Sequence, residues 1–78
     1  MTRILKQKVQ LKSKPWRMIW RNTTYLIKGI QEIWVYRGRW WQGEPERIFY
    51  LVELKDGTLC EICREYPGDD WFLYRLYD

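Results

Sequence analysis

Two cysteines, three positions apart, have the spacing most often linked to redox or metal chemistry. Cys60 and Cys63 fit the C-x-x-C pattern of redox enzymes and zinc sites. In redox enzymes the pair opens a helix, whereas here it lies within a predicted strand. Side chains three apart on a strand point to opposite faces, so these thiols are poorly placed to form a disulfide or share a metal. We therefore predict two reduced cysteines that act as small apolar packing residues, with neither a metal nor a cofactor.

The sequence offers little else for catalysis. It contains no histidine, which removes the commonest general base and metal ligand. Ser13 is the only serine, it has no base to activate it, and no glycine-rich phosphate loop is present. The loop carboxylates Glu44 and Glu46 are weak candidates for acid–base chemistry. We expect a binding protein rather than an enzyme, and we infer no small-molecule substrate.

The charged residues are unevenly distributed along a chain whose formal net charge is +4. Residues 1–31 contain eight basic residues and no acidic one, whereas residues 32–78 contain six basic and ten acidic residues. Such asymmetry is typical of chains that bind a polyanion, although a solvated basic face that keeps the protein soluble also explains it. The candidate phosphate contacts in the basic half are Lys12, Lys14, Arg17, Arg21 and Lys28.

Residues 34–41 interleave aromatic and basic side chains. Trp40 and Trp41 are adjacent, and neighbouring side chains diverge in extended backbone, so we expect at least one to be partly exposed. With Arg37 and Arg39 they form a set that could stack on bases and neutralise phosphates. The alternative is that the tryptophans plug the core and the arginines lie over their rings.

β-branched and aromatic residues alternate with polar ones over most of the chain, which indicates strands. Arg21 and Asn22 favour a tight turn because asparagine tolerates positive φ. Asp56 and Gly57 predict a two-residue hairpin turn, and Gly29 marks a bulge inside a long strand. The predicted strands cover residues 7–11, 16–20, 23–36, 47–54, 58–64 and 71–77, with a loop over residues 37–46.

This pattern predicts an all-β fold of about six short antiparallel strands in a small barrel or strongly curled meander. The 78 residues form one domain, with residues 1–6 as a flexible N-terminal lead. So short a chain has a marginal core, which its six Trp, six Tyr and two Phe enlarge. No apolar run reaches the roughly 18 residues of a membrane span, and the N-terminus lacks a signal-peptide pattern. We expect a cytoplasmic protein with no membrane partner.

Three segments resemble a known family. They are the motif GRWWxGEPxR at residues 38–47, the Asp56-Gly57 hairpin and the ending WFLYRLYD at residues 71–78. The family is a small bacterial all-β domain of uncharacterised function. It occurs free-standing and at the C-terminal end of Y-family DNA-polymerase-like repair proteins. The resemblance covers residues 15–78 and implies a DNA-repair context, but no activity and no site residues. Cys60 and Cys63 depart from it, since larger residues are expected there.

Two functional hypotheses follow. In the first, the chain is an accessory module that binds nucleic acid, single strands in preference, through its early basic residues and the Trp40–Trp41 loop. In the second, it docks on a repair polymerase or related protein through its aromatic surface or an exposed edge strand. A face shared by the basic residues and the loop favours the first hypothesis, and an exposed apolar patch favours the second.

Overall fold

The structure, a computed structural model, describes residues 2–14, 16–66 and 68–77. In this part of the chain the fold is all-β, as predicted, and its only helix is a single 3-10 turn. The elements are β1 (Thr2–Lys12), β2 (Arg17–Trp20), β3 (Thr23–Arg37), η1 (Trp40–Gln42), β4 (Glu46–Leu54), β5 (Leu59–Tyr66) and β6 (Asp70–Tyr77). Among the described residues, no helix is long and apolar enough to cross a membrane.

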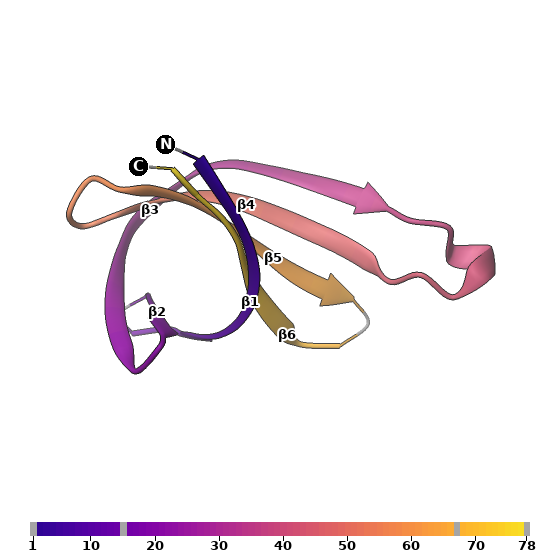
Figure 1. Ribbon diagram of the computed structural model, residues 1–78, viewed down its shortest axis with the longest axis horizontal. Coiled ribbons are helices and arrows are strands. Elements are labelled where there is room, and N and C mark those ends of the chain that lie inside the picture. Colours follow the sequence, from indigo (N-terminus) through magenta and orange to yellow (C-terminus); the bar gives the residue numbers. More distant parts are fainter. Residues whose placement is uncertain (1, 15, 67, 78) are drawn as a thin grey trace.

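The six strands form a closed antiparallel barrel in which each strand pairs with its neighbour in sequence and β1 pairs with β6 (Figure 1). The barrel closes because β1 has two partners. Its residues from Thr2 to Val9 pair with β6, and those from Gln10 to Lys12 pair with β2. β1 thus begins earlier than the predicted start at residue 7, and its first residues lie beside the end of β6, with Thr2 opposite Tyr77.

The turn between β2 and β3 has the form that the sequence predicts. Arg21 and Asn22 have φ values of 52° and 61°, and Trp20 pairs directly with Thr23. Positive φ at both central residues matches the right-handed twist of the flanking strands.

The turn between β4 and β5 corrects the predicted two-residue form. The Leu54 N–H donates to the Thr58 carbonyl at 2.8 Å, so the loop has three residues, and the last of them, Gly57, has a φ of 91°. This is a turn followed by a glycine bulge, the next commonest hairpin connection for the same residue types. A two-residue turn over Asp56 and Gly57 would place Val52 opposite Glu61. The extra residue shifts this register by one, so that Val52 pairs with Cys60.

Two bulges curve β3 around the barrel. Ile27 pairs with Leu54 and Gly29 with Glu53, which leaves one extra residue at the position predicted from the glycine. A second shift follows between Ile30 and Glu32. Bulges bend a strand and increase its twist, and here they let a long strand serve both the barrel and the sheet beyond it.

Buried apolar side chains from every strand fill the barrel. Met18 is only 1% exposed, and Trp20 and Tyr25 pack beside it with their ring centroids 6.1 Å apart. The Trp20 indole N–H donates to the Gln7 side-chain oxygen at 2.8 Å, so its polar atom is satisfied. The buried cluster comprises Val9, Met18, Ile27, Val52, Leu54, Cys60, Ile62 and Leu73.

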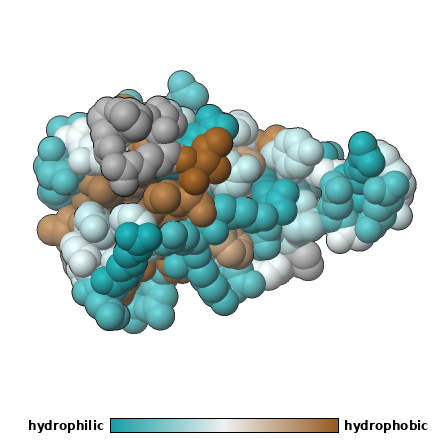
Figure 2. Space-filling model, in the orientation of Figure 1, coloured by the Kyte–Doolittle hydropathy of each residue, from teal (hydrophilic) through white to brown (hydrophobic). Residues whose placement is uncertain are grey.

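The far halves of β3 and β4 extend beyond the barrel as a projecting hairpin with η1 at its tip (Figure 1). In Figure 2 this hairpin is the narrow end of the molecule, and hydrophilic side chains cover its tip. Trp34 stacks on Phe49 at 5.5 Å, and Phe49 meets Tyr74 edge-to-face at 5.3 Å. These aromatic contacts join the hairpin to the outer face of the sheet.

The positive φ of Gly57 gives a stability prediction with a matched control. Gly57→Ala should lower the free energy of unfolding by about 1–2 kcal/mol, because a side chain strains this backbone conformation even though nothing lies within 4 Å of the added Cβ. Gly29→Ala also adds a Cβ to open space but at ordinary φ, so it should be close to neutral. Urea denaturation of both variants checks this, and equal losses would contradict it.

Candidate nucleic-acid interface

Two tryptophans lie at one open end of the barrel. Trp16 stands just before β2 and is 42% exposed. Trp71, at the start of β6, is half-buried and packs on Tyr50 with ring centroids 5.3 Å apart. Both residues line one depression together with Leu11, Lys12 and Ser13. Trp16 is held in place by its backbone, since its carbonyl accepts a hydrogen bond from the Ile27 N–H at 3.0 Å.

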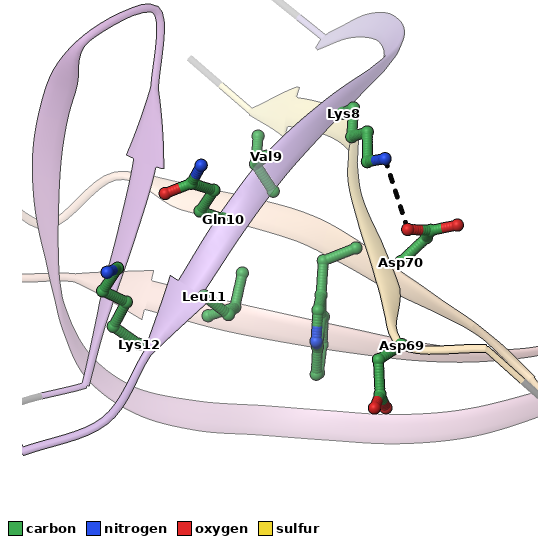
Figure 3. Close-up of a pocket in the computed structure, with 8 residues that line it drawn as sticks. Lys8, Val9, Gln10, Leu11, Lys12, Asp69 and Asp70 are labelled. Atoms are coloured by element: carbon green, nitrogen blue, oxygen red, sulfur yellow. Dashed lines mark ion pairs between the residues drawn. The ribbon is translucent and has the colours of Figure 1, made fainter.

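This depression continues in two directions. On one side it adjoins a hollow between β1 and the start of β6, which Trp71 also lines (Figure 3). On the other side Trp16 lines a second hollow along β3, from Ile27 to Ile30. We call the three together the tryptophan groove. It is lined by Lys8, Val9, Gln10, Leu11, Lys12, Ser13, Trp16, Ile27, Lys28, Gly29, Ile30, Asp69, Asp70 and Trp71.

Of the predicted basic residues, Lys12 and Lys28 line this groove, and Lys14 and Arg17 lie close to Lys12. Lys12 lies on its wall and pairs across the strands with Arg17, and exposed Lys14 lies in the turn between them. The Arg17 guanidinium donates to the Ser13 carbonyl at 3.5 Å, which holds it over the same turn. Neither Lys12 nor Lys14 forms an ion pair within the part of the chain that the structure describes. Their charges are therefore available to an anion.

The two acidic residues of the groove are matched by basic ones. Lys8 reaches from β1 to Asp70 at 3.3 Å, as Figure 3 shows. Asp69 accepts a hydrogen bond from the Arg64 guanidinium at 2.7 Å. These pairs offset the two acids, whereas Lys12, at the end of β1, has no acidic partner among the described residues.

The other early basic residues are less favourably placed. Lys28 lies on the β3 wall of the groove and pairs with Glu53 at 3.8 Å. Arg21 sits in the turn at the far end of β2, where its guanidinium lies 4.6 Å from the centroid of the Trp20 ring. That contact is the arrangement expected when arginines cover the tryptophans of a plugged core.

The remaining candidates lie at the tip of the projecting hairpin, away from the groove (Figure 1). The early basic residues and the Trp40–Trp41 loop therefore do not share the face that the first hypothesis expected. Arg37 pairs with Glu46 at 3.6 Å, while Arg39 and Trp41 are exposed, Trp41 by 66%. The exposure of Trp41 confirms that one of the adjacent tryptophans lies at the surface. The side chain of Trp40 lies outside the described residues.

A carboxylate organises this tip. Glu44 Oε2 accepts a hydrogen bond from the Arg39 N–H at 2.7 Å, and the Gln42 N–H donates to the Arg39 carbonyl at the same distance. Gly38 is buried under Glu44, and a Cβ added there would lie 2.7 Å from the same Oε2. The glycine and glutamate of the GRWWxGEP motif thus have a structural role.

Sequence reasoning missed Trp16 and Trp71 as candidate binding residues. It treated Trp16 as part of a strand and assigned the exposed stacking role to the paired tryptophans of the loop. The available signal was the Ser13-Lys14-Pro15 connection directly before Trp16, since a tryptophan at the edge of a connection is seldom fully covered.

The buried polar residue Glu61 has a structural role as well. It lies on β5 opposite Arg75 of β6, and its Oε2 accepts a hydrogen bond from the Tyr77 hydroxyl at 2.9 Å. The hydrogen bond with Tyr77, followed by the charge of Glu61, raises the pKa of the Arg75 guanidinium. These contacts link β5 to β6.

Both cysteines are free thiols, as predicted, and both are buried. Cys60 belongs to the barrel core, whereas Cys63 lies outside that cluster and pairs with Phe49 across the strands. They therefore occupy opposite faces of β5. Within the described ranges, no group of three His, Cys, Asp or Glu side chains could hold a metal ion.

The two thiols predict a loss of stability in alkali. Burial raises the pKa of Cys60 to about 12 and that of Cys63 to about 11, from an ordinary 9.0. Between pH 9 and 11 the unfolded chain therefore binds fewer protons than the folded one. The free energy of unfolding should fall as pH rises, by up to about 1.4 kcal/mol per pH unit for each thiol.

Urea denaturation at several pH values from 8 upward measures this slope. A Cys60→Ala and Cys63→Ala double variant is the control, because every other titrating group is retained. Its slope should be shallower, and identical slopes in the two proteins would contradict the prediction.

Comparison with known protein families identifies the family of this chain. Residues 3–78 match the family described as Domain of unknown function (DUF6504), and the chain belongs to that family. The comparisons with curated proteins and with solved structures gave no match. The match agrees with the expected resemblance to a small domain of uncharacterised function.

Proposed function

We propose that this member of the DUF6504 family is a non-enzymatic module that binds single-stranded nucleic acid in the tryptophan groove. The observation that carries the proposal is the placement of Trp16 and Trp71 in one depression with Lys12. Aromatic faces beside basic side chains are the usual means by which small β-barrels hold single strands.

The chemistry of the groove suits a strand of unspecified sequence. Bases could stack on the exposed face of Trp16, at about 1–3 kcal/mol for each base. Lys12, Lys14 and Arg17 lie close enough together to contact successive phosphates. Base-specific contacts in the major groove of a duplex require a helix or a β-ribbon that fits it, and the tryptophan groove supplies neither. Binding should therefore be weak, tolerant of sequence and sensitive to salt.

A role in DNA repair fits this activity. The resemblance to domains at the C-terminal end of Y-family polymerase-like repair proteins motivates it. The repair role and the cytoplasmic location are parts of the same proposal. Docking on a polymerase or related protein is the alternative function, and the exposed apolar residues of β3 support it.

Anisotropy of a labelled single-stranded oligonucleotide, measured at two salt concentrations, tests the proposal. Trp16→Ala should weaken binding about tenfold, which corresponds to the loss of one stacking contact. Trp41→Ala is the matched control, because it removes a tryptophan at the hairpin tip that is more exposed than Trp16, 66% against 42%. Urea denaturation confirms that both variants remain folded.

A charge-matched pair of double variants locates the phosphate contacts. Lys12→Ala with Lys14→Ala should reduce the slope of log affinity against log salt by about 1.4, since each single-strand phosphate contact contributes about 0.7. Arg37→Ala with Arg39→Ala removes the same charge from the tip and should leave the slope unchanged. If only the tip variants weaken binding, the site lies at the tip. If the unmodified chain binds neither single strands nor duplex at low salt, the proposal fails and protein docking becomes the default.

A further inference from the structure

The far half of β3 has a free edge. β2 pairs with β3 only from Thr23 to Leu26, whereas β4 pairs with it as far as Arg37. From residue 28 onward no described strand covers the edge of β3 that faces away from β4. In Figure 1 this part of β3 runs beyond the barrel with β4 on one side and no element on the other.

Exposed apolar residues lie on both faces of this part of the strand, next to the exposed polar residues Glu32 and Arg37. Ile33 is 58% exposed, Val35 51% and Tyr36 53%. Proteins usually protect edge strands with charges, prolines or bulges. Both bulges of β3 occur before Glu32, so the segment from Glu32 to Arg37 is regular and pairs with β4 without a shift. Such a segment is well suited to pair with another strand.

The side chains of this segment are complementary to those of the same segment in a second copy when the two pair in antiparallel fashion. If the same edge of β3 in two copies pairs in antiparallel fashion, the residue numbers of every opposed pair add up to one even number. The sum is even because alternate residues direct their backbone N–H and C=O groups to opposite edges of a strand, and both members of a pair must direct theirs to the shared edge. A two-fold axis at Trp34 places Ile33 opposite Val35 of the second copy, and Glu32 opposite its Tyr36. Within the described residues, the side chains of Glu32 and Tyr36 have no hydrogen-bond or ion-pair partner, so carboxylate and phenol could bond across the interface.

Neighbouring registers are less favourable. An axis at Glu32 brings two carboxylates together, which is destabilising. An axis at Ile33 draws the bulge before Glu32 into the pairing. An axis at Val35 places Ile33 opposite Arg37. Of these registers, only the one centred on Trp34 excludes the bulge, keeps like charges apart and places no charged residue opposite Ile33 or Val35.

We propose that two copies of this chain associate through the edges of β3, in antiparallel register centred on Trp34, to form one continuous sheet. This association is independent of the tryptophan groove. A short strand pair buries less surface than a permanent dimer requires, so the dimer should form reversibly as concentration rises.

Sedimentation velocity over a concentration range that reaches millimolar tests the association. The unmodified chain should shift from monomer towards dimer. Ile33→Lys should keep it monomeric, because the new charge would face Val35 of the second copy at two positions. Leu26→Lys is the matched control, since Leu26 is also an exposed apolar residue of β3 but its edge is covered by β2.

Disulfide trapping tests the register. A Glu32→Cys and Tyr36→Cys double variant should give a covalent dimer on mild oxidation, because these positions oppose each other across the axis. Within one chain they are separated by about 13 Å, beyond the roughly 7 Å that a disulfide spans. Each single variant should remain uncrosslinked. The native cysteines are buried and should not contribute.

Three outcomes would overturn the proposal. The chain could remain monomeric at every concentration, which would leave the edge for an extended segment of another protein. Ile33→Lys and Leu26→Lys could behave alike, which would place the contact elsewhere. Glu32→Cys alone could crosslink, which would show that the axis lies at Glu32.

Discussion

The closure of a very small barrel is the constraint on which the rest of the structure depends. Closure requires β1 to hydrogen-bond to β6 over its first part and to β2 over its last, and β3 to bend through two bulges. Only then do residues from all six strands converge on Met18, Ile62 and Leu73, which have almost no exposed surface. A flat sheet of this length would leave those side chains half in water and its two outer edges unpaired.

The shortness of β2 creates both candidate surfaces. With only four residues, β2 completes the ring but covers little of its neighbours. At its start, Trp16 is left over the open end of the barrel, where it meets Trp71. Along β3, no strand of the described part of the chain pairs with the second edge beyond Leu26, where only the Ile27 N–H still bonds to Trp16. One short strand thus accounts for an aromatic groove on the barrel and an apolar edge on the projecting hairpin.

The sequence predicted the strands well because alternation and turn residues are local signals. Arg21 and Asn22 form the expected turn, and Gly29 lies at the expected bulge. The Asp56-Gly57 turn was harder, since the same residues suit loops of two or three residues and only cross-strand packing selects between them. The site was harder still. Whether Trp16 is exposed depends on where β2 begins, and that is decided by the closure of the ring, not by residues near Trp16.

Dimerisation through the β3 edge is compatible with binding in the tryptophan groove. In the dimer, the grooves of the two copies would lie one after the other. Pairing centred on Trp34 leaves Lys28, at the β3 wall of the groove, six residues from the axis in each copy. At about 3.3 Å per residue, the two walls lie at most about 40 Å apart, because the bulge before Glu32 shortens the path. A strand long enough to reach both grooves would bind the second one at high effective concentration. Weak, sequence-tolerant contacts in each groove could therefore sum to firm binding on long single strands, while short strands would dissociate readily.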